Sequence, residues 1–200
     1  GFGDGEMIGP DSTQVDSLLQ YVGFDKIDFT ENQAISNMPN MKLSFSAIAK
    51  GQAIDVVADW LETQDLNNYM VEIGGEVRAK GQNLEDETWT IGIEQPNEQR
   101  IGGLFDAIQL NDQGMATSGN YRNFRIVNGK KVAHTIDPTT GFPKMQTLLS
   151  ATILAPSCML ADGYATACMV MGLEGSKKLV ESNPELEGYF IYANEAGEMV

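Results

Sequence analysis

Two oxygen-bearing side chains lie four residues apart in an otherwise apolar stretch, at Asp162 and Thr166. This spacing places a carboxylate and a hydroxyl on the same face of a helix. Both groups are hard oxygen donors of the kind that Mg²⁺ prefers, and Mg²⁺ usually takes only one or two protein side chains and leaves its other positions to water and phosphate. A purely structural alternative is that Asp162 interacts with the helix N-terminus and Thr166 bonds to the carbonyl four residues earlier. The spacing by itself leaves both interpretations open.

A second polar cluster, S-A-I-A-K-G-Q-A-I-D at 46–55, opens a predicted helix that carries Lys50 in its first turn. A helix N-terminus beside a lysine can hold a diphosphate, although an ordinary helix start with an exposed lysine has the same pattern. In a third cluster, Gly74 and Gly75 join two predicted strands. This pair predicts either a tight turn or bulge, or a place where the main chain approaches a ligand closely.

The chain has one histidine, His134, in the segment A-H-T-I-D-P-T-T-G-F-P at 133–143. A single histidine is more often structural than catalytic. The turn-forming residues at 136–141 nevertheless favour a fixed position for the strand that carries His134, as a functional site would need. The sequence contains no Walker loop, no G-x-G-x-x-G motif and no paired-histidine metal motif.

The elements that must position these residues are predicted from hydrophobic periodicity and turn residues. We expect helices at about 12–22, 50–63 and 174–182, and a buried helix that starts after Ser157 and is closed by Gly172. We expect strands near 24–29 and 41–45, at 69–73, 76–80, 88–94, 104–110, 148–155 and 188–193, and a hairpin with its turn at Asn128-Gly129. Helices packed on a mostly antiparallel sheet make the expected fold class α+β.

The composition predicts a single globular domain spanning residues 1–200, because 42% of the residues are hydrophobic. Acidic residues number 28 against 13 basic ones, and the net charge of -15 disfavours nucleic acid and anionic lipid as partners. A phosphate ester would therefore need local neutralisation, which favours a metal ion. Cys158 and Cys168 match no zinc spacing and are expected to be buried thiols. The sequence shows no signal peptide and no apolar run of membrane-spanning length.

Five motifs occur in an order that resembles the FAD:protein FMN transferase (ApbE) family. They are S-A-I-A-K-G-x-A-I-D at 46–55, I-G-G-E-V-R at 73–78, A-T-S-G-N-Y at 116–121, H-T-I-D-P-T-T-G at 134–141 and A-P-S-C-M-L-A-D-G-Y-A-T-A at 155–167. The resemblance spans nearly the whole chain, and the ordered set is far more specific than any one motif.

The resemblance implies an α+β, ApbE-like fold that is truncated at both ends, without the family's N-terminal segment and C-terminal strand. It implies that magnesium is held by Asp162, Thr166 and the main-chain carbonyl of Ala47. The implied FAD contacts are Ser44, Lys50 and the main chain near Ile136, and His134 matches the histidine considered a general base. At two positions the chain departs from the family pattern: Ser44 stands where many members have aspartate, and Glu76 follows the glycine pair where aspartate is usual.

The implied activity is magnesium-dependent transfer of FMN from FAD to a threonine of an acceptor flavoprotein, with release of AMP. The expected partners are FAD and a membrane flavoprotein subunit of a respiratory complex. The expected location is the periplasmic face of the inner membrane, often with a lipoprotein anchor. Two alternatives stay open: an FAD pyrophosphatase that gives free FMN and AMP, and a non-catalytic FAD-binding protein.

Overall fold

The computed structural model describes residues 12–96, 103–119, 124–127, 130–133, 136–142, 147–196 and 198–200. The chain forms two compact units, one of Gly1–Leu43 with Arg125–Met145 and the other of Ser44–Phe124 with Gln146–Val200. In the described residues, no helix has both the length and the apolar character needed to cross a membrane.

The first unit contains short elements. Its described elements are α1 (Ser12–Leu19), a 3₁₀ turn (Phe24–Lys26), β1 (Ile27–Thr30), β2 (Gln33–Ser36) and β9 (Lys130–Ala133), which pairs with β8 (Phe124–Val127). The helix predicted at 12–22 ends at Leu19, three residues earlier than expected. Strand β1 pairs with β2 in an antiparallel arrangement. The prediction of a strand at 41–45 is wrong, because that segment has no sheet partner and is irregular. The β8–β9 pair agrees with the predicted hairpin, although its turn residues lie outside the described residues.

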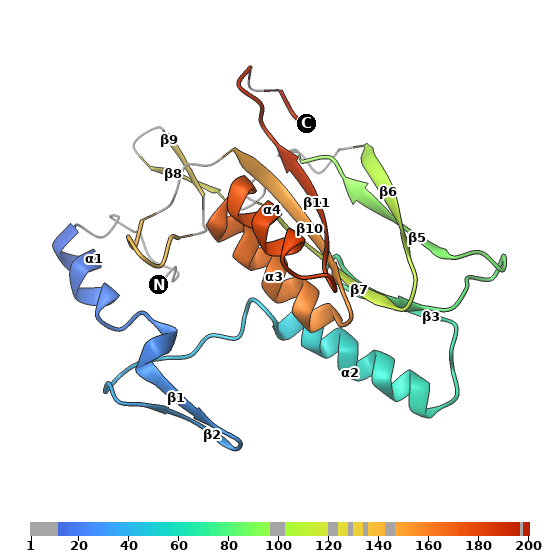
Figure 1. Cartoon of the computed structure of the whole chain (residues 1–200), viewed down its shortest axis with the longest axis horizontal. Coiled ribbons are helices and arrows are strands. Elements are labelled where there is room, and N and C mark those ends of the chain that lie inside the picture. Colours follow the sequence, from blue (N-terminus) through green and yellow to red (C-terminus); the bar gives the residue numbers. More distant parts are fainter. Residues whose placement is uncertain are drawn as a thin grey trace. The chain divides into compact units, whose positions relative to one another are not determined.

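The second unit is built on one five-stranded sheet in the order β11-β10-β7-β4-β3 (Figure 1). The strands are β3 (Tyr69–Ile73), β4 (Glu76–Lys80), β7 (Gln113–Gly119), β10 (Leu148–Ala155) and β11 (Glu187–Tyr192). Every neighbouring pair in this sheet is antiparallel. The predicted α+β class is confirmed, and β3, β4 and β10 have the predicted bounds.

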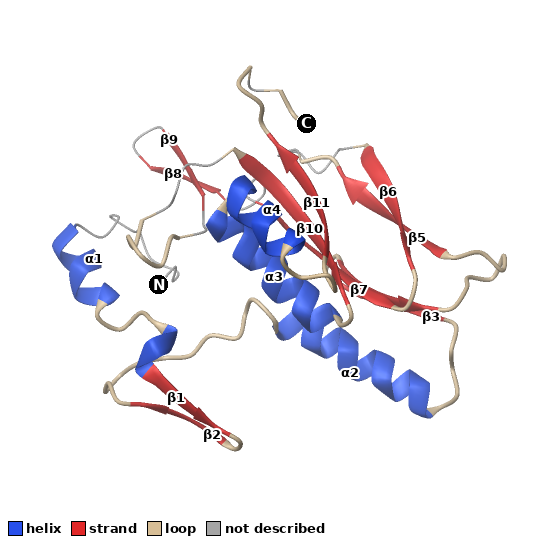
Figure 2. Cartoon of the chain, in the orientation of Figure 1, coloured by secondary structure: helices blue, strands red, loops and turns tan. Residues whose placement is uncertain are grey.

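Three helices cover one face of this sheet: α2 (Ala49–Thr63), α3 (Cys158–Met171) and α4 (Leu173–Glu181) (Figure 2). The apolar core on this side joins small residues of β7 and β10, such as Ala116 and Ala151, to the inner face of α3, including Ala161 and Ala165. Small side chains on both surfaces let α3 lie close to the strands. The side chain of Ser157 caps α3 by accepting a hydrogen bond from Leu160 N at 3.3 Å.

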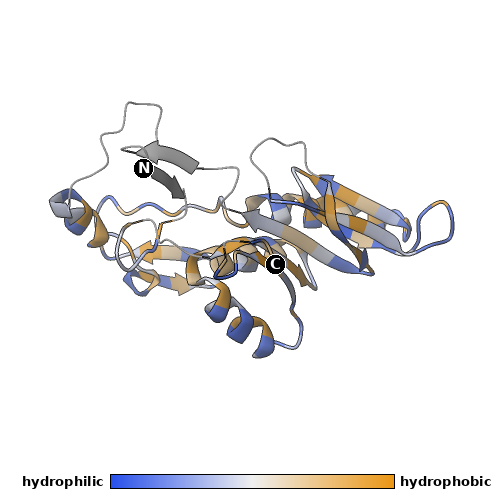
Figure 3. Cartoon of the chain, turned by 90° about the horizontal axis from the view of Figure 1, so that it is seen from above, coloured by the Kyte–Doolittle hydropathy of each residue, from blue (hydrophilic) through white to orange (hydrophobic). Residues whose placement is uncertain are grey.

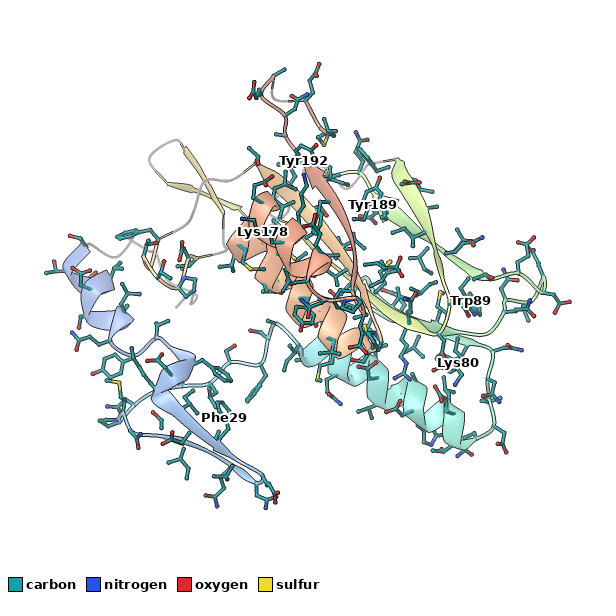
Figure 4. All side chains as sticks on the ribbon, viewed as in Figure 1. Phe29, Lys80, Trp89, Lys178, Tyr189 and Tyr192 are labelled. Atoms are coloured by element: carbon teal, nitrogen blue, oxygen red, sulfur yellow. The ribbon has the colours of Figure 1, made fainter. Side chains whose placement is uncertain are left out.

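The opposite face is covered by a hairpin of β5 (Trp89–Glu94) and β6 (Leu104–Leu110). In β5 the apolar residues Trp89, Ile91 and Ile93 alternate with more exposed positions, as in a strand with one buried face, and Figure 3 colours the chain by hydropathy. Trp89, Ile91 and Ile108 pack on a second core formed by strand residues that include Val77 and Met115. The indole of Trp89 donates to the main-chain oxygen of Lys80 at 3.0 Å, and Figure 4 labels both residues.

Candidate functional site

The N-termini of α2 and α3 cross, and each is capped by a carboxylate of the other helix. The main-chain N–H groups of Cys158 and Met159, at the start of α3, both donate to Asp55 of α2 at 2.9 Å. In return, Gly51 N in the first turn of α2 donates to Asp162 Oδ2 of α3 at 3.0 Å. The first N–H groups of a helix have no partner within the helix, and a negative charge there is favourable. The pair of helices therefore satisfies its own termini with two buried carboxylates, Asp55 and Asp162.

Two glycines permit this close crossing. A Cβ at Gly51 would clash with the main chain of Cys158 and Met159, and a Cβ at Gly114 of β7 would clash with the main chain of Ser157 and Cys158. The start of α3 is thus held between α2 and β7 at main-chain distance. This packing fixes the position of Asp162, one turn further along α3.

A third buried carboxylate, Glu76, lies at the start of β4, directly after the turn formed by Gly74 and Gly75. Both glycines have positive φ, 65° and 102°, so the tight-turn interpretation of this pair is confirmed. Glu76 is 3% exposed and forms an ion pair with Lys50 through Oε1. Burial raises the pKa of the Glu76 carboxyl, Lys50 lowers it, and the negative charge of Asp162 raises it further.

The helix-facing side of β4 continues this charged contact with α2. Arg78 donates to Asp55 at 3.1 Å, to Asp59 at 2.9 Å and to Glu62 at 3.3 Å. Lys80, the next residue on that face, donates to Glu62 at 2.9 Å. These pairs orient α2 on the sheet, and Arg78 supplies the positive charge that balances buried Asp55.

Thr166 is on the same helix as Asp162, as the i, i+4 spacing predicts, and is partly buried. Its hydroxyl is 3.4 Å from the hydroxyl of Ser118 in β7, within hydrogen-bond distance. Ser118 belongs to the A-T-S-G-N-Y motif and Thr166 to the motif at 155–167. The structure thus brings two motifs together through residues that are 48 positions apart. Asp162 does bond to a helix N-terminus, as the structural alternative required, but the terminus is that of α2.

The other predicted site residues are placed as follows. Ser44 and Ala47 precede α2; the Ser44 hydroxyl is hydrogen-bonded to that of Ser46 at 2.7 Å, and Ala47 is partly buried in the turn that leads into the helix. Ile136 belongs to the first unit and is 36% exposed. The predicted base, His134, lies outside the described residues. The structure thus gathers Lys50, Asp162 and Thr166 around the α2–α3 crossing and gives no geometry for His134.

Cys158 and Cys168 are both buried with free thiols, which confirms the sequence interpretation. Burial raises the pKa of the Cys158 thiol to about 12, and the nearby charges of Asp55, Asp162 and Glu76 add to the increase. The thiol therefore stays protonated at neutral pH and belongs to the packing of the crossing.

The oxygen groups at this crossing fit a hard divalent cation. Asp162 supplies a buried carboxylate and Thr166 a hydroxyl one turn along the same face. Glu76 supplies a carboxylate whose buried Oε2 has no hydrogen-bond partner within the described segments. No group of three or more His, Cys, Asp or Glu side chains suited to a metal ion occurs among the described residues. In the sequence, Glu76 stands out only as a departure from the family pattern, and Asp55 is not identified as a site residue. The partners of both residues are distant in the chain, so no local pattern predicts these contacts.

Comparisons with known proteins show that this chain is similar to flavin transferases in sequence and in fold. The FAD:protein FMN transferase of Haemophilus influenzae is 41% identical over 192 residues, which cover 94% of this chain and 55% of that protein. The flavin transferase ApbE from Vibrio cholerae superposes with a TM-score of 0.84 at 36% identity, over 99% of this chain and 62% of that one. The apo form of the Pseudomonas stutzeri flavinyl transferase ApbE gives a TM-score of 0.83 at 31% identity, over 98% and 59%.

The chain spans about half the length of the curated relatives it matches. The family assignment nevertheless covers most of this chain, since the ApbE family model matches residues 1–190. With that match, the identities above 30% and the shared α+β fold, the chain belongs to the ApbE family.

Proposed function

We propose that this protein is a magnesium-dependent FAD:protein FMN transferase. The observation that carries the proposal is the convergence of Lys50, Asp162 and Thr166, from two separate family motifs, at one helix crossing. The names of the relatives, which are FAD:protein FMN transferases, support the same activity. The substrate class, a flavin dinucleotide, fits a site that combines oxygen ligands for a cation with a lysine in the first turn of a helix.

In the proposed reaction, the hydroxyl oxygen of an acceptor threonine forms a bond to the FMN phosphorus of FAD. The bond from that phosphorus to the oxygen shared with AMP breaks, and AMP leaves with the electron pair. Bound magnesium would neutralise the charge that develops on the diphosphate. Asp162, Thr166 and the carbonyl of Ala47 would hold the ion.

The remaining proposed roles belong to side chains that bind FAD or move the proton. Lys50 would face the diphosphate, and Ser44 and the main chain at Ile136 would contact FAD. His134 would take the threonine proton, because an imidazole with a pKa near 6.5 can act as a base at neutral pH.

We also propose, from the family resemblance, that the acceptor is a membrane flavoprotein subunit and that the protein acts at the periplasmic face of the inner membrane, as an exported lipoprotein. Fractionation of cells that produce the protein, with flavin fluorescence of separated membrane proteins, tests both points. Recovery of the protein in the cytoplasmic fraction would contradict the proposed location.

The activity itself is tested by incubating the protein with FAD, Mg²⁺ and a threonine-containing acceptor peptide, followed by mass spectrometry. Transfer predicts a peptide that carries FMN, together with AMP in equal amount. Free FMN with AMP would indicate a pyrophosphatase, and intact bound FAD would indicate a non-catalytic flavin-binding protein.

Asp162→Asn should abolish transfer, whereas Thr166→Val should weaken it less, because a neutral hydroxyl contributes less than a carboxylate. Asp59→Asn, a change of an exposed α2 carboxylate, is the matched control.

A further inference from the structure

One carboxylate oxygen of Glu76 receives no hydrogen bond from the part of the chain that the structure describes. Its side chain is 4% exposed, Oε1 accepts a hydrogen bond from Lys50, and Oε2 is buried with no hydrogen-bond partner among the described residues. A buried carboxylate oxygen without a partner is costly, because the group has lost its hydration without replacement. A bound water molecule or ligand that donates a hydrogen bond to this oxygen would offset that cost.

The buried carboxylates of this region differ in how far the protein satisfies them. Both oxygens of Asp55 are engaged, by the N–H groups of Cys158 and Met159 and by Arg78. Capping α3 and pairing with Arg78 thus occupy both oxygens of Asp55. Asp162 and Glu76 are different: among the described residues, Asp162 accepts one hydrogen bond, from Gly51 N, and Glu76 accepts one, from Lys50.

The position of Glu76 relates it to the proposed cation site. It starts β4 on the face of the sheet that contacts α2 and α3, and its ion-pair partner Lys50 lies in the first turn of α2. Asp162 bonds to Gly51 N, and Gly51 is next to Lys50, so both carboxylates contact the first turn of α2. Like charges held at one helix turn repel each other, and a divalent cation relieves that repulsion.

We propose that Glu76 is a positioning residue of the magnesium site, in which Oε2 accepts a hydrogen bond from a water molecule bound to the ion while Oε1 holds Lys50 in place. This inference rests on the proposed function, because it presumes that Asp162 and Thr166 hold magnesium. Mg²⁺ gives up its water reluctantly and usually keeps several water ligands, which require acceptors in the surrounding protein. Loss of such an outer acceptor typically lowers metal affinity about 10- to 100-fold.

The test is calorimetric titration of Mg²⁺ into the FAD-saturated protein, for wild type, Glu76→Gln, Glu76→Asp and Asp162→Asn. Glu76→Gln keeps an acceptor for Lys50 but removes the charge, so magnesium affinity should fall about 10- to 100-fold. Glu76→Asp keeps the charge and should restore most of the affinity. Glu62→Gln, which changes a carboxylate at the far end of α2 that is paired with Lys80, is the matched control and should leave the affinity unchanged.

Thermal unfolding without metal separates positioning from a structural role. Since Glu76→Gln removes a buried charge with an unpartnered oxygen, its metal-free melting temperature should equal or exceed that of wild type. A lower melting temperature together with wild-type magnesium affinity would overturn the inference and leave Glu76 as a structural partner of Lys50. If wild type binds no magnesium, or if Asp162→Asn binds it as well as wild type, the proposed metal site itself fails. If only Glu76→Gln matches wild type, this inference alone fails.

Discussion

The carboxylate of Asp55, in the middle of α2, caps the first residue of α3, Cys158, across 103 residues of sequence at 2.9 Å. This bond ties together the two helices that carry Lys50 and Asp162. Asp55 also forms an ion pair with the guanidinium of Arg78. The same side chain therefore holds the start of α3 in place and balances the positive charge of Arg78.

Asp55→Ala should lower the free energy of unfolding by about 3 kcal/mol, since it removes a helix cap and leaves Arg78 without its most buried partner. Chemical denaturation measures this loss. Asp59→Ala is the control, because Asp59 contacts the same guanidinium but its side chain is 68% exposed. Its cost should stay within about 1 kcal/mol. Equal costs for the two variants would contradict the capping role of Asp55.

Gly51→Ala should destabilise the protein even though alanine favours helices. The added Cβ meets the main chain of Cys158, which cannot rotate away, so we expect a net loss of about 1–3 kcal/mol. Gly163→Ala is the matched change on α3, where the new Cβ meets only a methyl group of Ile48, at 3.1 Å. Denaturation midpoints of the two variants provide the measurement. A loss for Gly163→Ala as large as that for Gly51→Ala would show that close packing at Cys158 is not the cause.

Cys158 should resist alkylation in the folded protein. Its pKa of about 12 lies above the ordinary thiol value, so the reactive thiolate forms only as pH rises toward that value. Iodoacetamide at about pH 8, where an ordinary thiol is already partly ionised, should leave Cys158 unmodified by mass spectrometry. The same treatment in denaturant should modify it fully and serves as the control. Rapid modification of the native protein at that pH would show that the thiol is accessible and ionised.

His134→Ala should slow FMN transfer by roughly 10²–10⁴-fold while changing FAD affinity little, because a general base acts in the transition state. Wild-type transfer should fall on the acid side as the imidazole, with an ordinary pKa of about 6.5, becomes protonated. Single-turnover transfer at saturating FAD and Mg²⁺, across about pH 5.5–8.5, tests both points. A structural histidine would give the reverse pattern: weaker FAD binding, lower thermal stability and a nearly normal rate for the bound flavin.

Local patterns predicted much of the second unit. The strands at 69–73 and 76–80 have the predicted ends, because alternating residues and the Gly74-Gly75 turn determine them within a few positions. The strand β7 was not predicted, because small residues such as Gly114 and Ala116 are required there by contact with α3. The apolar residues at 41–45 suggested a strand, yet strand formation needs a pairing partner, and Gln33–Ser36 is the segment that pairs with β1.

In the candidate site too, local patterns predicted the contacts between neighbouring residues and missed those between distant ones. The i, i+4 spacing placed Asp162 and Thr166 on one helix because that relationship is local. The capping by Asp55 and the pairing of Glu76 with Lys50 depend on contacts 103 and 26 residues apart, which no local pattern encodes. Residue type therefore indicated which groups could bind a cation. Only the tertiary contacts distinguished Asp55, whose two oxygens both accept hydrogen bonds, from Asp162 and Glu76, which can accept more.

The exchange of caps between α2 and α3 has a consequence for the motions of the chain. Gly51 N can become accessible to solvent only when its bond to Asp162 opens, and the amides of Cys158 and Met159 only when their bonds to Asp55 open. Each bond depends on the same helix crossing, so the three amides should exchange hydrogen for deuterium together, with similar protection, as one cooperative unit. In that case the proposed cation site would open and close as a whole, and fraying of a single helix end would not be enough to expose it.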